Sequence, residues 1–230
     1  MDIKNYYIEK VQGFPLILLH GNGEDNSYFE HQIDFFSKKY RVIALYTRGH
    51  GKTQRGERSF TIAQFADDLY DFMIYHKIEK ANILGFSDGA NIAMKFVLKY
   101  PEKVEKLIVN GGNLSPKGVK RSVQLPIEIG YKIAKLFAKK SAGAKKNAEM
   151  LGLMVNDPFI DAVCLEEISV QSLVVAGTKD MILKSHTELI AAHIPNSKLL
   201  FIKGDHFVAN KNPDEFNKAV DDFLDETTPA

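Results

Sequence analysis

The sequence has little cysteine, no long apolar run and no marked excess of one charge. Its single thiol, Cys164, excludes an internal disulfide framework and a cysteine-based metal cluster. No apolar run approaches the ~18 residues that a membrane span needs. The first five residues, Met1–Asn5, lack the apolar core of a signal peptide. The sequence therefore predicts a cytoplasmic protein in a reducing compartment, without stable membrane insertion.

The charge balance also limits the class of partner. Thirty Lys+Arg against 29 Asp+Glu give a net charge of +1, which argues against a wholly basic nucleic-acid binder. With 45% hydrophobic and 26% charged residues, the chain resembles an ordinary soluble protein rather than a disordered segment or a coiled coil. Its 230 residues can bury a large single core.

Short apolar runs that break at or near glycine alternate with helical patterns. This alternation predicts an α/β fold, with a mostly parallel central sheet and helices on both faces. The predicted strands are Pro15–Leu19, Arg41–Leu45, Ala81–Leu84, Val104–Val109, Ser172–Ala176 and Lys198–Ile202, with an edge strand near Tyr6–Val11. The predicted helices are Ser27–Lys39, a helix capped by Thr61, Asn91–Tyr100, Ser185–His193 and Pro213–Leu224.

One segment interrupts this alternation. Residues 113–165 contain no clear strand and are longer than an ordinary connection, so we expect a helical cap inserted into a core domain of residues 1–112 and 166–230. The segment has nine Lys+Arg and four acids, which suits either an anionic partner or a solvated outer face. An apolar stripe is expected to be buried over the active site; its members are Leu125, Ile129, Ile133 and Phe137.

Three residues, each placed after a predicted strand, form a candidate catalytic triad. Ser87 lies in Gly85-Phe86-Ser87-Asp88-Gly89, a G-x-S-x-G sequence between a predicted strand and a predicted helix. A serine hydroxyl needs a base, and His206 follows the last predicted strand. Asp180 follows the preceding strand and would orient the histidine, although the adjacent Asp205 could compete.

The oxyanion of an acyl-transfer intermediate needs amide donors. One candidate is the backbone N–H of Asp88, directly after the serine. The other is that of Asn22, which lies between two glycines after the first buried strand. Candidate pocket residues are Ile133, Phe137, Met150, Met154 and Phe207, for which ordinary core packing is an equally good explanation.

Taken together, these motifs resemble the α/β-hydrolase fold superfamily, in its branch of small esterase-like and haloperoxidase-like serine hydrolases. The matching pieces are His20-Gly21-Asn22-Gly23, Arg48-Gly49-His50-Gly51, the Ser87 motif, Ala176-Gly177-Thr178-Lys179-Asp180 and Gly204-Asp205-His206-Phe207. The resemblance implies that His50 is structural. Tyr46 stands where the family often has an aspartate, and the short region before Pro15 implies that one or two edge strands are missing.

The expected function is hydrolysis of a carboxylic ester or related small acyl compound through an acyl-enzyme, without a metal or organic cofactor. Alternatives on the same fold are C–C bond hydrolysis, amide or aminopeptidase hydrolysis, and perhydrolysis. A non-catalytic ligand-binding protein is a rival from another class, but such proteins commonly lose a triad member. The expected partner is a small acyl substrate and not nucleic acid. The sequence does not determine whether the chain forms a homo-oligomer.

Overall fold

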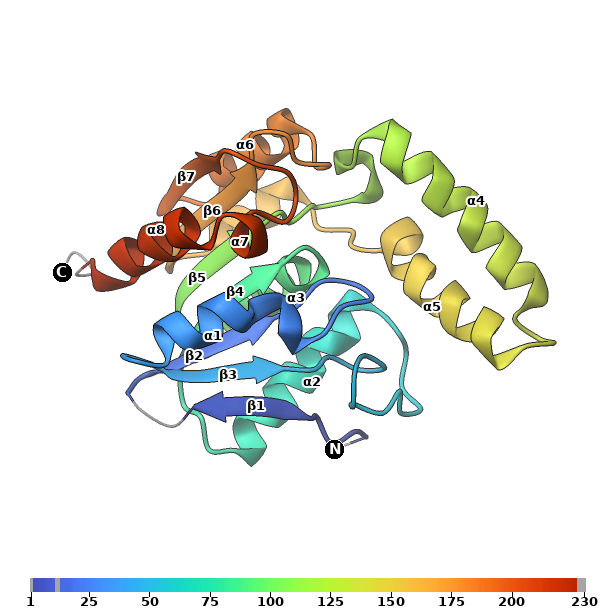
Figure 1. Ribbon diagram of the computed structural model, residues 1–230, viewed down its shortest axis with the longest axis horizontal. Coiled ribbons are helices and arrows are strands. Elements are labelled where there is room, and N and C mark those ends of the chain that lie inside the picture. The colour runs from blue at the N-terminus through green and yellow to red at the C-terminus, as the bar shows by residue number, and fades with distance from the viewer. Residues whose placement is uncertain (1, 11–12, 227–230) are drawn as a thin grey trace.

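Residues 2–10 and 13–226 are described by a computed structural model, and within them seven strands form one sheet (Figure 1). The strand order is β1-β3-β2-β4-β5-β6-β7, with β1 antiparallel to β3 and every other neighbouring pair parallel. The strands are β1 (Tyr7–Lys10), β2 (Pro15–Leu19), β3 (Arg41–Leu45), β4 (Ala81–Phe86), β5 (Val104–Asn110), β6 (Gln171–Gly177) and β7 (Ser197–Ile202).

The described part also contains eight α-helices and four short 3₁₀ helices, which lie between the strands or follow the last one. The α-helices are α1 (Glu30–Phe36), α2 (Ile62–Tyr75), α3 (Asp88–Lys99), α4 (Arg121–Phe137), α5 (Ala142–Asn156), α6 (Lys184–His193), α7 (Val208–Lys211) and α8 (Pro213–Asp225). The 3₁₀ helices are η1 (Asn26–Phe29), η2 (Pro101–Lys103), η3 (Pro116–Gly118) and η4 (Ala162–Glu167).

The predicted α/β architecture is confirmed, with differences at the ends of elements. The strand expected to stop at Leu84 continues to Phe86 and is buried along its whole length. The edge strand is confirmed as Tyr7–Lys10, while Val11 lies outside the described residues. The expected N-cap is also confirmed, because Thr61 Oγ1 accepts a hydrogen bond of 3.2 Å from the N–H of Gln64.

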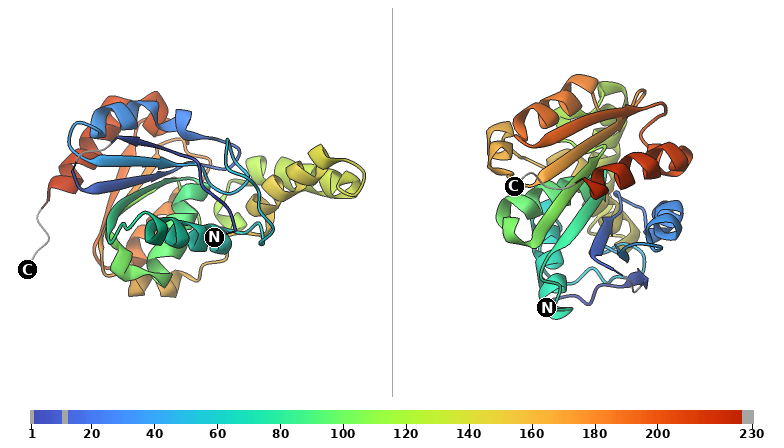
Figure 2. Two further views of the ribbon diagram at one scale, coloured as in Figure 1. Left: turned by 90° about the horizontal axis from the view of Figure 1, so that it is seen from below. Right: turned by 90° about the vertical axis from the view of Figure 1, so that its left-hand side faces the viewer.

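The core lies in two layers, one on each face of the sheet. Successive residues of a strand point to opposite faces, so Ile17 and Leu19 pack in one layer while Leu16 and Leu18 pack in the other. The first layer includes buried residues of α2, α3 and α6, and the second includes those of α1, α7 and α8. Figure 2 shows these helices on the two sides of the sheet. The parallel strands therefore end at one common edge, where their loops meet.

The α4–α5 hairpin projects away from the sheet (Figures 1 and 2). Its base is tied to the core, since Leu114, Ile160 and Leu165 belong to the buried layer that contains α2 and α3. The apolar stripe expected to be buried is exposed instead. Leu125, Ile129, Ile133 and Phe137 are between 43% and 56% exposed, because α4 packs on α5 through its opposite face. In the part of the chain described, no helix is long and apolar enough to cross a membrane.

Candidate active site

Ser87 occupies a sharp turn between β4 and α3. Its φ of 54° and ψ of −119° lie in a region that L-residues rarely adopt, so the backbone is strained at this residue. The N–H of Ser87 donates a 2.8 Å hydrogen bond to the carbonyl of Asn110 at the end of β5, which fixes the turn to the neighbouring strand. The serine thus lies where strand β4 ends and helix α3 begins.

The two glycines of the Ser87 motif are required by close packing. A Cβ on Gly85 would lie 2.2 Å from the carbonyl oxygen of Gly89. A Cβ on Gly89 would lie 2.0 Å from the carbonyl oxygen of Leu19 in β2. Any side chain at either position would therefore open the turn and shift Ser87 away from the end of the sheet.

His206 and Asp180 form a buried pair. His206 Nδ1 lies 2.7 Å from Asp180 Oδ1, and the two side chains are 4% and 3% exposed. Asp180 also accepts hydrogen bonds from the N–H groups of Ile182 and Gly177. Burial favours the neutral carboxyl, but the His206 hydrogen bond and these amides outweigh it and hold the pKa of Asp180 below its usual value. Asp180 is therefore an ionised partner for the imidazole.

The imidazole of His206 also packs against residues next to the serine turn. The His206 ring packs on that of Phe86 with centroids 4.8 Å apart, and a Cβ on Gly111 would lie 2.8 Å from His206 Cε1. Phe86 directly precedes Ser87. Gly111 directly follows Asn110, whose carbonyl accepts the hydrogen bond from the N–H of Ser87. His206 Nε2 is buried and has no hydrogen-bond partner among the described residues, so no bond to Ser87 Oγ is formed. Catalytic hydrogen bonds are often longer in an enzyme without its substrate.

Asp205, the competing carboxylate, is directed elsewhere. Its side chain is 45% exposed and pairs with Lys211 at 2.5 Å. It also accepts a 3.0 Å hydrogen bond from the N–H of Phe207. The geometry therefore brings His206 together with Asp180 and separates it from the carboxylate of Asp205.

The two predicted amide donors flank the same edge of the sheet. Asp88 is the first residue of α3, so its N–H has no acceptor within the helix. Asn22 lies in the loop after β2, and its side-chain Nδ2 donates a 2.7 Å hydrogen bond to the carbonyl of Met150 in α5. That bond links the loop after β2 to the projecting hairpin. The assignment of both amides to an oxyanion hole stays a prediction.

Glu24 was not singled out from the sequence, although it lies in the same glycine-containing loop. Burial raises the pKa of its carboxyl from 4.5 to about 7. Its Oε2 is buried without a hydrogen-bond partner in the described structure and faces the space beside Gly21 and the Phe86 ring. The only sequence signal was its place beside the predicted oxyanion loop, which does not reveal burial.

His50 packs among other aromatic side chains, as a structural residue would. Its ring lies 5.1 Å from that of His20 and stacks near Phe60. Burial lowers the pKa of His20 and of His50 to about 4, so both imidazoles are neutral near pH 7. His20 Nε2 accepts a 3.2 Å hydrogen bond from the N–H of Thr47, which positions the loop after β3.

The candidate pocket residues lie in different surroundings. Phe207 packs against the rings of Phe86 and His206, with centroids 5.8 and 5.6 Å away. Met150 and Met154 are half-buried in α5, and the carbonyl of Met154 accepts from the side chain of Gln124. Ile133 and Phe137 are more than half exposed on α4, so the structure does not place them against the triad residues. The sequence missed this because a helical stripe shows periodicity without showing which neighbour covers it.

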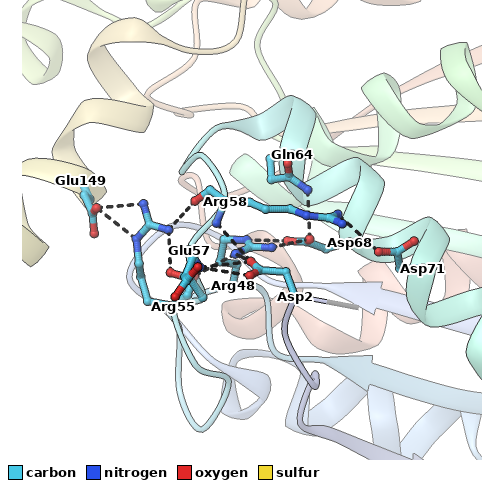
Figure 3. Close-up of polar contacts among 10 residues, drawn as sticks. Asp2, Arg48, Arg55, Glu57, Arg58, Gln64, Asp68, Asp71 and Glu149 are labelled. Carbon is cyan, nitrogen blue, oxygen red and sulfur yellow. Dashed lines mark hydrogen bonds and ion pairs between the residues drawn. The ribbon is translucent and has the colours of Figure 1, made fainter.

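A cavity of about 380 Å³ lies between α5 and the loop after β3, lined in part by Phe60, Lys145 and Met150. Figure 3 shows how this loop is held: Arg55 binds Glu149 of α5, and the buried Arg48 binds Asp68 of α2. Arg55 Nη2 and Nε lie 2.9 and 3.0 Å from Glu149 Oε1. This ion pair joins the loop after β3 to the α4–α5 hairpin.

The chain is similar to known proteins. Residues 15–127 match the family model for the alpha/beta hydrolase fold. The chain is 28% identical to serine hydrolase BPHL of Homo sapiens over 96% of this chain and 83% of that protein.

Two solved structures share the fold. The enol-lactonase of Burkholderia xenovorans LB400 has a TM-score of 0.82 and 20% identity, with 97% of each chain covered. A meta-cleavage product hydrolase of Pseudomonas fluorescens IP01 has a TM-score of 0.80 and 22% identity, with 98% of this chain and 96% of that chain covered.

Proposed function

Because this chain belongs to the α/β-hydrolase fold superfamily, we propose that it is a serine hydrolase acting on a carboxylic ester or related small acyl compound. Ser87 is the nucleophile, His206 the base and Asp180 the residue that orients the base. The observation that carries this proposal is the buried 2.7 Å contact between His206 and Asp180 next to the strained serine turn. The likeness to serine hydrolase BPHL agrees with it.

The proposed reaction has two steps. His206 Nε2 takes the proton of Ser87 Oγ as this oxygen attacks the carbonyl carbon, and the amides of Asn22 and Asp88 stabilise the oxyanion. The protonated imidazole then gives its proton to the leaving oxygen, and an acyl-Ser87 ester remains. Water, deprotonated by His206, hydrolyses that ester and restores the serine. Asp180 stays ionised and stabilises the imidazolium, which agrees with its lowered pKa.

The surroundings of Ser87 favour a substrate with hydrogen-bonding groups. Besides His206 Nε2, which serves Ser87, Asn22 Oδ1 and Glu24 Oε2 are buried and lack partners in the described part of the chain. Buried polar atoms without partners are costly, so a bound molecule that supplies them gains binding energy. Small esters with polar acyl or alcohol parts and lactones are therefore proposed as better substrates than long alkyl esters.

A second candidate is hydrolysis of a carbon–carbon bond beside a carbonyl group. It is favoured by the fold shared with the meta-cleavage product hydrolase. The same three residues would serve, with a carbanion in place of an alkoxide as the leaving group. Substrate profiling separates the two candidates, because a C–C hydrolase prefers its diketone-like substrate to simple esters by a large factor.

The test is a panel of chromogenic esters of graded chain length together with lactones and a vinylogous diketone. We expect turnover of short esters or lactones by the unmodified protein and by Ser185→Ala, a control at an exposed serine of α6. Ser87→Ala should lose on the order of 10⁶ in kcat. Absence of turnover across the panel, or equal turnover by both serine variants, would refute the proposal.

A further inference from the structure

The outer face of α4 exposes a continuous apolar stripe. Each of its members is more than two-fifths exposed: Leu125, Ile129, Ile133, Leu136 and Phe137. Surface apolar residues are ordinary when scattered singly, but a contiguous row marks an interaction site. Five large side chains along one helix therefore require a partner.

Unpaired lysines lie beside this stripe and along the turn and helix that follow it. Residues 129–148 contain six lysines and no acid. All six are exposed, and none forms an ion pair among the described residues: Lys132, Lys135, Lys139, Lys140, Lys145 and Lys146. Helical spacing places Lys132 and Lys135 along one border of the stripe. The surface thus combines an apolar row with positive charge.

Local helix electrostatics do not account for all of these lysines. Cations near the C-terminus of α4 are favoured by the helix dipole, which explains Lys135 and Lys139. Lys145 and Lys146 belong to α5 and line the cavity between α5 and the loop after β3, so they face the core loops and not the stripe. The lysines near the stripe are therefore Lys132, Lys135, Lys139 and Lys140, and an anionic partner outside the chain would offset their mutual repulsion.

Two other occupants of the stripe fit less well. The helix that contacts the core loops is α5, through Glu149 and Met150, while α4 lies on its far side (Figure 1). Movement of the hairpin against the core would therefore bury α5 rather than the outer face of α4. A second copy of the chain would bring two lysine-rich faces together, and like charges repel.

We propose that the outer face of α4, with Lys132, Lys135, Lys139 and Lys140, binds reversibly to an anionic lipid bilayer surface. The apolar side chains enter the boundary between headgroups and acyl chains, and the lysines contact lipid phosphates. This is adsorption of one amphipathic helix and needs no membrane-spanning segment. It is independent of the reaction proposed for Ser87.

Sedimentation with vesicles of phosphatidylglycerol and phosphatidylcholine, compared with phosphatidylcholine alone, tests the proposal. Ile129→Ser/Leu136→Ser removes apolar contacts, and Ile74→Ser/Tyr75→Ser is its control at two exposed positions of α2. Lys132→Gln/Lys135→Gln/Lys139→Gln removes three charges. Lys38→Gln/Lys184→Gln/Lys218→Gln removes three exposed charges elsewhere. Thermal unfolding verifies that each variant is folded.

We expect binding to the anionic vesicles, weakened by added salt. The apolar α4 variant should bind about tenfold less tightly, and the lysine variant about a hundredfold less tightly, at about fivefold per lysine near the surface. Both controls should bind about as tightly as the unmodified protein. Absence of binding, equal binding to both vesicle types, or equal weakening by the controls would overturn the proposal. A concentration-dependent dimer disrupted by Ile129→Ser/Leu136→Ser would assign the face to a second copy instead.

Discussion

Two carboxylates lie near one histidine, and their surroundings give them different roles. Asp180 is buried against His206, whereas Asp205 is half exposed and pairs with Lys211. We predict that Asp180→Asn lowers kcat on the order of 10⁴-fold, because the amide stabilises the wrong imidazole tautomer. Asp205→Asn should change kcat only slightly. Steady-state kinetics of the two variants on one ester decide between them, and a larger loss at Asp205 would mean that the acid is misassigned.

Glu24 should make stability depend on pH. Its pKa is 4.5 in an unfolded chain and about 7 in the folded protein, so the folded state retains its proton over that interval. Stability contributed by this group therefore falls as pH rises from 4.5 to about 7, and the loss is complete above that range.

The variant Glu24→Gln cannot ionise and should escape this loss. We expect it to be more stable than the unmodified protein at pH 8, with the difference shrinking toward pH 5. Urea unfolding of both proteins at several pH values provides the measurement. A stability difference that is the same at pH 5 and pH 8 would contradict the proposed burial of the charge.

Individual residues differ in how far the sequence could identify them. The positions of Ser87, Asp180 and His206 after strands were predictable because glycines mark the tight turns at those strand ends. Glu24 was not, since its raised pKa depends on burial by residues distant in the sequence. The choice between Asp180 and Asp205 also needed the structure to settle which carboxylate contacts the imidazole.

At the scale of elements, the sheet was predicted well and the hairpin less well. Buried parallel strands are continuous apolar runs, so β2 and β3 were predicted with their observed bounds. The end of β4 was missed because Gly85 resembles a strand terminator, yet it continues the strand. The exposure of the apolar face of α4 was missed because sequence periodicity reveals such a face but does not show which part of the protein packs against it.

The α4–α5 hairpin should open more readily than the sheet. It contains Gly130, Gly143 and Gly152, each of which weakens a helix by roughly 0.5–1 kcal/mol relative to alanine. Its contacts with the core loops include the Arg55–Glu149 ion pair and the hydrogen bond from Asn22 to Met150. We predict faster amide hydrogen exchange in α4 and α5 than in β4 and β6.

The variant Glu149→Gln tests whether the ion pair with Arg55 limits exchange in the hairpin. Removal of one charge of the ion pair should increase exchange further in α5 and leave β4 unchanged, as measured by mass spectrometry. Glu188→Gln, in a surface pair on α6, is the matched control. Exchange in the hairpin as slow as in β4 would show that the segment is not a mobile cap.

For the whole molecule, the buried Arg48 connects separate parts of the chain. Its side chain has no exposed surface and donates to both carboxylate oxygens of Asp68, at 2.6 and 2.7 Å. It also contacts the carboxylate of Asp2 and donates to the carbonyl of Arg55 (Figure 3). The N-terminus, the loop after β3 and α2 are thus held by one guanidinium. The sequence identified the turn that contains Arg48 through the resemblance, but it gave no indication of these partners.

We predict that Arg48→Ala lowers the free energy of unfolding by about 3–5 kcal/mol, since it leaves the buried Asp68 carboxylate without its partner. The matched control is Arg58→Ala, which removes an exposed ion pair with Asp71 and should cost less than about 1 kcal/mol. Urea denaturation at pH 7 measures both. Equal losses would show that burial does not distinguish the two pairs.

Covalent labelling tests the central assignment most directly. A fluorophosphonate reacts with a serine only where that serine is activated by a base, so it should add once to the folded protein, on the peptide that contains Ser87. Asp180→Asn should slow the reaction, and Ser185→Ala should not. We predict that Ser87→Ala is unlabelled; a labelled Ser87→Ala, or a label mapped to another serine, would contradict the assignment of Ser87 as the nucleophile.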